Sequence, residues 1–118
     1  MQDLKYRYKK FAIETGVLIQ SLPRSIINTA YSNQFIRSSS SPGTNYRSAC
    51  RGKSTADFIN KLKIVEEELD ESIYFLELIK HFNSDNKVQI NALIKESNEL
   101  LAITVQSLKT IRLNSRTS

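Results

Sequence analysis

The chain has 118 residues, of which 40% are hydrophobic and 25% are charged, a composition typical of one globular domain with one core. Three glycines and two prolines are too few for a β fold with many turns, so the composition favours long helices. The single cysteine, Cys50, excludes an internal disulfide and a cysteine-based zinc site.

Charge is distributed unevenly along the chain, whose formal net charge is +5. Residues 1–53 carry nine Lys and Arg against two Asp and Glu, whereas residues 54–118 carry eight against ten. Either the basic half faces RNA or DNA, or the two halves neutralise each other within a bundle or between subunits. The N-terminus lacks the apolar core of a signal peptide, and no apolar run has the roughly 20 residues that span a bilayer. We therefore expect a cytoplasmic protein without membrane contact.

Residues 2–21 are predicted to form the first helix. Its apolar stripe recurs every three or four positions, at Leu4, Tyr8, Phe11, Thr15, Leu18 and Leu22. This spacing is typical of an amphipathic helix. Pro23 ends the helix, because the residue before a proline avoids the helical region.

Residues 34–51, within the region 24–51, are the least generic part of the chain, since four consecutive serines precede Pro42 and Gly43 there. Local rules predict two helices here, 24–39 and 44–51, with a break between them. Polar and small residues nevertheless keep a helical 4-3-4-3 spacing across the break, at Gln34, Ser38, Ser41, Asn45 and Ser48. We therefore predict a nearly collinear second helix that is kinked near Pro42.

Two further helices follow. Residues 54–57 resemble a capping box, after which one stripe repeats at 4-3 spacing through Phe58, Leu62, Val65, Leu69, Ser72, Leu76 and Ile79. Ser84 or Asp85 is expected to cap the fourth helix, over about 86–112, whose stripe is Ile90, Ile94, Ser97, Leu101, Thr104, Leu108 and Ile111, flanked by Leu93 and Leu100. The prediction is an all-α, antiparallel up-down-up-down four-helix bundle, one domain over residues 1–113, followed by a frayed polar tail at 114–118.

Three blocks of this sequence resemble a known family. They begin at Arg37, Ser54 and Glu68, and they match R-S-x-x-S-x-G-x-N-x-x-E-A, S-x-x-D-F-x-x-K-L and E-x-x-E-x-x-Y-W-L-E-L within residues 34–79. The chain thus resembles the bacterial four helix bundle proteins, also called the 23S rRNA intervening-sequence protein family. Two positions depart from the pattern: Ser48 replaces an acid, and Phe75 replaces a tryptophan.

The resemblance implies a bundle whose Pro-Gly segment lies within the second helix, and a ring-like homopentamer. One branch of the family is the accessory protein of diversity-generating retroelements, which partners a reverse transcriptase and binds nucleic acid through a basic surface. For most members no biochemical function is established.

No group of residues in the sequence indicates catalysis, a cofactor or a metal site. His81 and Cys50 are the only residues of their types, and nothing in the sequence brings them together. The structural signature comprises Gln34, Arg37, Ser38, Ser41, Asn45, Glu68 and Glu71. In one interpretation the small side chains allow close packing, Asn45 and Gln34 bond the acids of the third helix, and Arg37 forms a buried ion pair with Glu68 or Glu71. In the other, arginines beside this face hold phosphates.

Candidate nucleic-acid contacts are Lys5, Arg7, Lys9, Lys10, Arg47, Arg51 and Lys53. On the first helix these cations alternate with tyrosines, which suits single-stranded nucleic acid but equally suits a helix with half-buried rings. The function predicted is a non-enzymatic oligomeric bundle that binds RNA or DNA electrostatically. The alternative is a protein-interaction adaptor, such as an accessory subunit of a retroelement reverse transcriptase.

Overall fold

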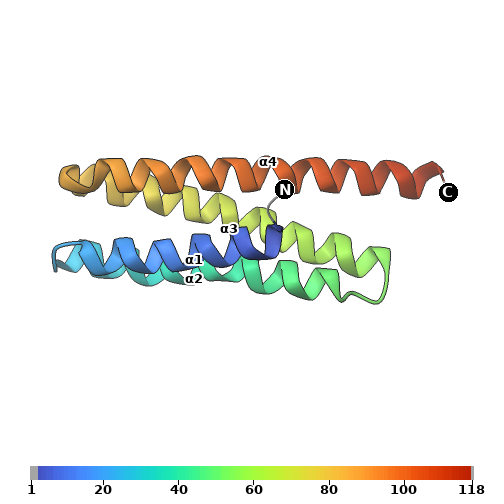
Figure 1. The fold of residues 1–118 in the computed structure, drawn as a ribbon, viewed down its shortest axis with the longest axis horizontal. Coiled ribbons are helices and arrows are strands. Elements are labelled where there is room, and N and C mark those ends of the chain that lie inside the picture. Colours follow the sequence, from blue (N-terminus) through green and yellow to red (C-terminus); the bar gives the residue numbers. More distant parts are fainter. Residues whose placement is uncertain (1–2, 118) are drawn as a thin grey trace.

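Four helices make up the structure, a computed structural model that describes residues 3–117, with side chains for residues 3–114. They are α1 (Leu4–Ser21), α2 (Ile26–Cys50), α3 (Thr55–Phe82) and α4 (Lys87–Thr117), with a short 3-10 turn, η1 (Ser84–Asn86), before α4. Successive helices run antiparallel and form a rod of 53 × 23 × 20 Å (Figure 1). No strand occurs within residues 3–117, so the all-α four-helix prediction is confirmed.

The helices begin at capping side chains. The Asp3 carboxylate accepts from the backbone N–H of Lys5 at 3.2 Å, and the hydroxyl groups of Ser25 and Ser54 accept from the third residue after each, at 2.9 and 3.1 Å. The Ser54 cap was expected from its capping box. The cap predicted for the fourth helix was wrong, because Ser84 and Asp85 lie inside η1, which leads directly into α4. The helix α4 extends to Thr117, beyond the predicted end near residue 112.

A single helix, α2, runs through Pro42 without interruption. The break that local rules predict between residues 39 and 44 is therefore absent, and the continuous periodicity was the better guide. Proline has no N–H to donate to the carbonyl four residues earlier. Pro42 is buried within the helix, and the loss of this one hydrogen bond does not interrupt α2.

The core lies along the predicted stripes in α1 and α3, whereas α2 presents a mostly polar face to the core. Fully buried side chains include Tyr8, Phe11 and Leu18 of α1 and Leu62, Val65, Leu69, Leu76 and Ile79 of α3. In α4 the most buried residues are Ile90, Leu93, Leu100 and Leu108, whereas Ile94 and Leu101 are only partly buried. The core face of α2 is mostly polar and small, and Phe35 is its one large side chain that is completely buried.

Small residues let α2 approach its neighbours closely. The Ser72 hydroxyl donates to the Ser38 hydroxyl at 3.0 Å, between α3 and α2. On the α1 side, a Cβ added to Gly43 would lie 3.3 Å from the Cβ of Tyr8. The interpretation of the serine-rich stretch as a close-packing surface agrees with these contacts.

Two buried asparagines connect the turns at one end of the bundle. Asn28 and Asn83 donate their amides to each other's oxygens at 2.9 and 2.8 Å. Asn28 also donates to the carbonyl of Pro23, and Asn83 to that of Ile79, both at 2.8 Å. The pair thus ties the α1–α2 connection to the end of α3.

Gly16 offers a simple stability test. Nothing lies within 4 Å of the position that a Cβ would occupy there, so Gly16→Ala should raise the free energy of unfolding by about 0.5–1 kcal/mol, the helix-propensity difference. Urea denaturation with an unchanged slope would measure it. Gly43→Ala serves as the control and should gain less, because its new methyl presses on Tyr8. A lower stability for Gly16→Ala than for the wild type would contradict this expectation.

Candidate nucleic-acid interface

The signature residue Arg37 pairs with two acids of α3. Its Nη1 donates to both carboxylate oxygens of Glu68 at 3.2 Å, and its Nη2 donates to Glu71. Burial raises the pKa of the Glu68 carboxyl, and the Arg37 hydrogen bond opposes that rise. The predicted pairing of Arg37 with these acids is confirmed. The predicted burial of the ion pair is wrong, because the Arg37 side chain is 51% exposed.

The other signature residues do not reach the acids of α3. Asn45 donates instead to the carbonyl and hydroxyl of Ser41, both at 3.0 Å, within α2 itself. Gln34 is exposed, and among the described residues its side chain meets no carboxylate. The predicted bonds from Asn45 and Gln34 to α3 are therefore wrong, since local partners satisfy Asn45 and Gln34 faces solvent.

The cations of α1 are less available than their spacing indicates. Arg7 donates to Glu96 through Nε at 3.1 Å and Nη2 at 2.5 Å, and to Glu99 at 2.9 Å. Its side chain is only 18% exposed, and the hydrogen bond to Glu96 raises the pKa of its guanidinium. Lys10 lies 3.9 Å from Glu14. Arg7 is therefore less available to a phosphate than its position indicates, and of the α1 cations only Lys5 and Lys9 are exposed and free of an ion pair among the described residues.

The remaining predicted cations gather at the α2–α3 connection. Arg51 and Lys53 line a hollow of about 460 Å³ together with Ser48, Gly52, Asp57 and Lys61. Arg47 lies one helical turn before Arg51 and is exposed. We call the four cations Arg47, Arg51, Lys53 and Lys61 the basic end. None of them forms an ion pair within the part of the chain that the structure describes, although Asp57 lies in the same hollow.

Lys61 was missed by sequence reasoning, although a signal for it existed. A short connection between antiparallel helices places the first two turns of α3 beside the last two turns of α2. Lys61 lies in the second of those turns. The carboxylates Glu96 and Glu99 carry no such signal, because their contact with Arg7 depends on how α1 packs against α4.

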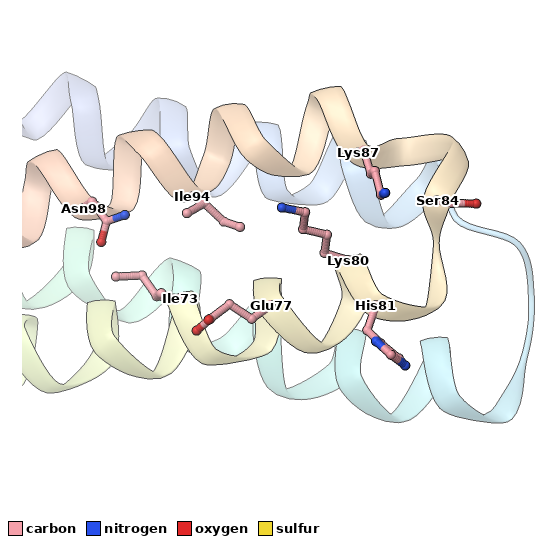
Figure 2. A pocket seen from close by; sticks show the side chains of 8 residues that line it. All are labelled: Ile73, Glu77, Lys80, His81, Ser84, Lys87, Ile94 and Asn98. Atoms are coloured by element: carbon pink, nitrogen blue, oxygen red, sulfur yellow. The ribbon is translucent and has the colours of Figure 1, made fainter.

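A second hollow, of about 760 Å³, lies between α3 and α4 near η1 (Figure 2). Ile73 of α3 and Ile94 of α4 lie on its two sides, the Lys80 side chain extends from α3 into the space between the two helices, and Lys87 lies nearer to η1. His81 is also among its lining residues, with its ring directed away from α4 in Figure 2, and Cys50 lies at the opposite end of the bundle. Within residues 3–114, no three His, Cys, Asp or Glu side chains are placed to hold a metal ion.

Comparisons with known proteins agree with the fold. The family model described as 23S rRNA-intervening sequence protein matches residues 4–106. A crystal structure from Bacteroides thetaiotaomicron, described as a protein of unknown function from the S23 ribosomal protein family, superimposes with a TM-score of 0.80 at 29% sequence identity. The match covers 91% of this chain and 99% of that one. No curated protein matches, and neither similarity points to a catalytic activity.

None of the described helices combines the length and apolarity needed to cross a bilayer.

Proposed function

The chain belongs to the 23S rRNA-intervening sequence protein family, and on this premise we propose that it is a non-enzymatic, self-associating bundle that binds RNA or DNA phosphates. One observation carries the proposal. The basic end gathers four cations from two helices and their connection, none with an ion pair among the described residues. Cations that are not neutralised within the protein are free to replace the counterions of a phosphate backbone.

The expected binding is electrostatic and does not depend on base sequence. The basic end lies at the α2–α3 connection, near one end of the bundle (Figure 1), and no aromatic residue lines its hollow to offer a ring on which a base could stack. Each phosphate contact should therefore steepen the salt dependence of binding without selecting a sequence.

The test compares two triple variants that change the net charge equally. Arg51→Glu/Lys53→Glu/Lys61→Glu removes the basic end, and Lys87→Glu/Lys95→Glu/Lys109→Glu removes three exposed lysines of α4. In filter binding to single-stranded and duplex RNA and DNA, the first variant should lose affinity and lower the slope of log K against log salt by about one unit for each contact. The second should retain most of both. Absence of retention of the wild type at low salt, insensitivity to salt, or equal losses in the two variants would overturn the proposal.

The self-association that we propose is the ring-like homopentamer implied by the family resemblance, with α2 kinked at Pro42. It is supported by large apolar side chains that are about half exposed on the outside of the bundle, among them Tyr6, Ile13 and Val17 of α1. Light scattering would test it, since a single species of 13.5 kDa would exclude the ring.

A protein-interaction adaptor is the second candidate, and an aromatic seam between α2 and α3 favours it. The Tyr31 ring lies 6.3 Å from that of Phe75 and 6.1 Å from that of Phe82, and Phe82 is 50% exposed. A reverse transcriptase encoded nearby is the partner that we propose for this role. In a pull-down, the adaptor role predicts capture by the Arg51→Glu/Lys53→Glu/Lys61→Glu variant, which has lost its basic end.

A further inference from the structure

The outward face of α1 combines apolar side chains with unpaired lysines. Tyr6, Ile13 and Val17 are 54%, 56% and 52% exposed, and their spacing of seven and four residues aligns them along one side of the helix, away from the buried stripe. Lys5 and Lys9 lie beside this stripe, exposed and without an ion pair among residues 3–114. We call these five residues the α1 face.

The outward face of α3 carries the opposite charge. Glu67, Asp70, Tyr74 and Glu77 follow one another at spacings of three, four and three residues and are all exposed, with Tyr74 at 58%. Together they form the α3 face. Its three carboxylates are not paired with any described cation, and like charges at these spacings on one helix destabilise it. The α3 face borders a hollow of about 650 Å³. Arg37 also lines this hollow, where it forms ion pairs with Glu68 and Glu71.

The two faces match in length and position. Tyr6 to Val17 and Glu67 to Glu77 each extend over about 15–17 Å at 1.5 Å per residue. The helices α1 and α3 each pack against α2 and α4, so they occupy opposite corners of the bundle. One copy is therefore able to use both faces at the same time, toward different neighbours.

We propose that self-association places the α1 face of one copy against the α3 face of the next. Lys5 and Lys9 then lie opposite the carboxylates of α3, and the apolar side chains of α1 pack around Tyr74. The two faces differ, so the contact is heterologous, and repeating it generates a closed ring or an open filament. This inference rests on the self-association in the proposed function. It also assigns Lys5 and Lys9 to the contact between copies and leaves phosphates to the basic end.

Charge reversal on one face, and then on both, tests the pairing. Lys5→Glu/Lys9→Glu makes both faces acidic, and Glu67→Lys/Asp70→Lys makes both basic. Because like charges then meet across the contact, each double variant should weaken self-association by about 100-fold or more in sedimentation or light scattering. The variant with all four substitutions restores opposite charges and should recover the wild-type assembly.

Two controls make the outcomes distinct. Lys95→Glu/Lys109→Glu changes the charge as much as Lys5→Glu/Lys9→Glu but lies on α4 outside both faces, and it should assemble as the wild type does. Circular dichroism checks that every variant remains helical. A wild-type chain of 13.5 kDa at all concentrations would refute self-association itself. A wild-type oligomer that tolerates either reversal, or that the fourfold variant fails to restore, would refute this contact while self-association stands.

Discussion

Replacing Phe35 by alanine should lower the free energy of unfolding by about 3–5 kcal/mol, the usual cost of deleting a buried phenyl ring. The ring is completely buried, and it is the one large side chain of α2 in that state. Elsewhere the core face of α2 presents small or polar residues such as Ser38 and Ser39, which contribute little apolar area. Because a small domain is stable by only about 5–15 kcal/mol, urea denaturation should show a large drop in the midpoint.

Phe82→Ala is the matched control for this substitution. The Phe82 ring contacts Tyr31 and His81 but is 50% exposed, so its removal leaves no enclosed cavity and should cost clearly less. Equal losses for the two variants would show that α2 is not anchored through Phe35.

Asn83→Leu should lower the free energy of unfolding by about 1–3 kcal/mol, because it leaves the buried Asn28 amide without its partner. Asn28→Leu should cost a similar amount, because the Asn83 amide oxygen then loses its donor and one Asn83 N–H loses its acceptor, while the bond to the Ile79 carbonyl remains. Both side chains are only 6% exposed, so water does not readily replace the lost partner. Chemical denaturation of each variant measures the loss.

The double variant makes this expectation sharper. Asn28→Leu/Asn83→Leu removes both partners together, so its loss should be smaller than the sum of the single losses by about 1 kcal/mol or more. Asn91→Leu, at an exposed position of α4, should change stability by less than about 0.5 kcal/mol. Additive losses in the cycle would mean that the two amides do not depend on each other.

Apolar periodicity was sufficient to predict the fold. The stripes of α1 and α3 identified the buried residues, and the continuous 4-3 spacing through Pro42 correctly outweighed the local signals for a break. Spacing did not predict which of two adjacent apolar residues is the more buried, because that depends on how the helix packs. In α4, Leu93 and Leu100 are buried more deeply than Ile94 and Leu101, because α4 turns its face toward both α1 and α3.

The candidate site was only partly predictable, for reasons of geometry. Arg47, Arg51 and Lys53 are close in sequence and stay together at the end of α2 and its connection. The cations of α1 do not act as one group, because Arg7 is hydrogen-bonded to Glu96 and Glu99, which lie about 90 positions away in the sequence. A charge count along the chain does not show which cations are neutralised by residues of a distant helix.

The seam between α1 and α4 also determines how the chain closes into a bundle. The other packed helix pairs are neighbours in sequence, so they can form as local hairpins with little loss of chain entropy. Tyr8 reaches Thr104 at 3.1 Å across 96 positions, and Arg7 spans 89 and 92 positions to its two acids. Closing the bundle costs chain entropy, because the α1–α4 contact joins residues far apart in the sequence. The hydrogen bonds of two adjacent residues, Arg7 and Tyr8, help to offset that cost. A chain shortened by its first helix would keep three helices in local contact, with the α1-facing side of α4 left open to solvent.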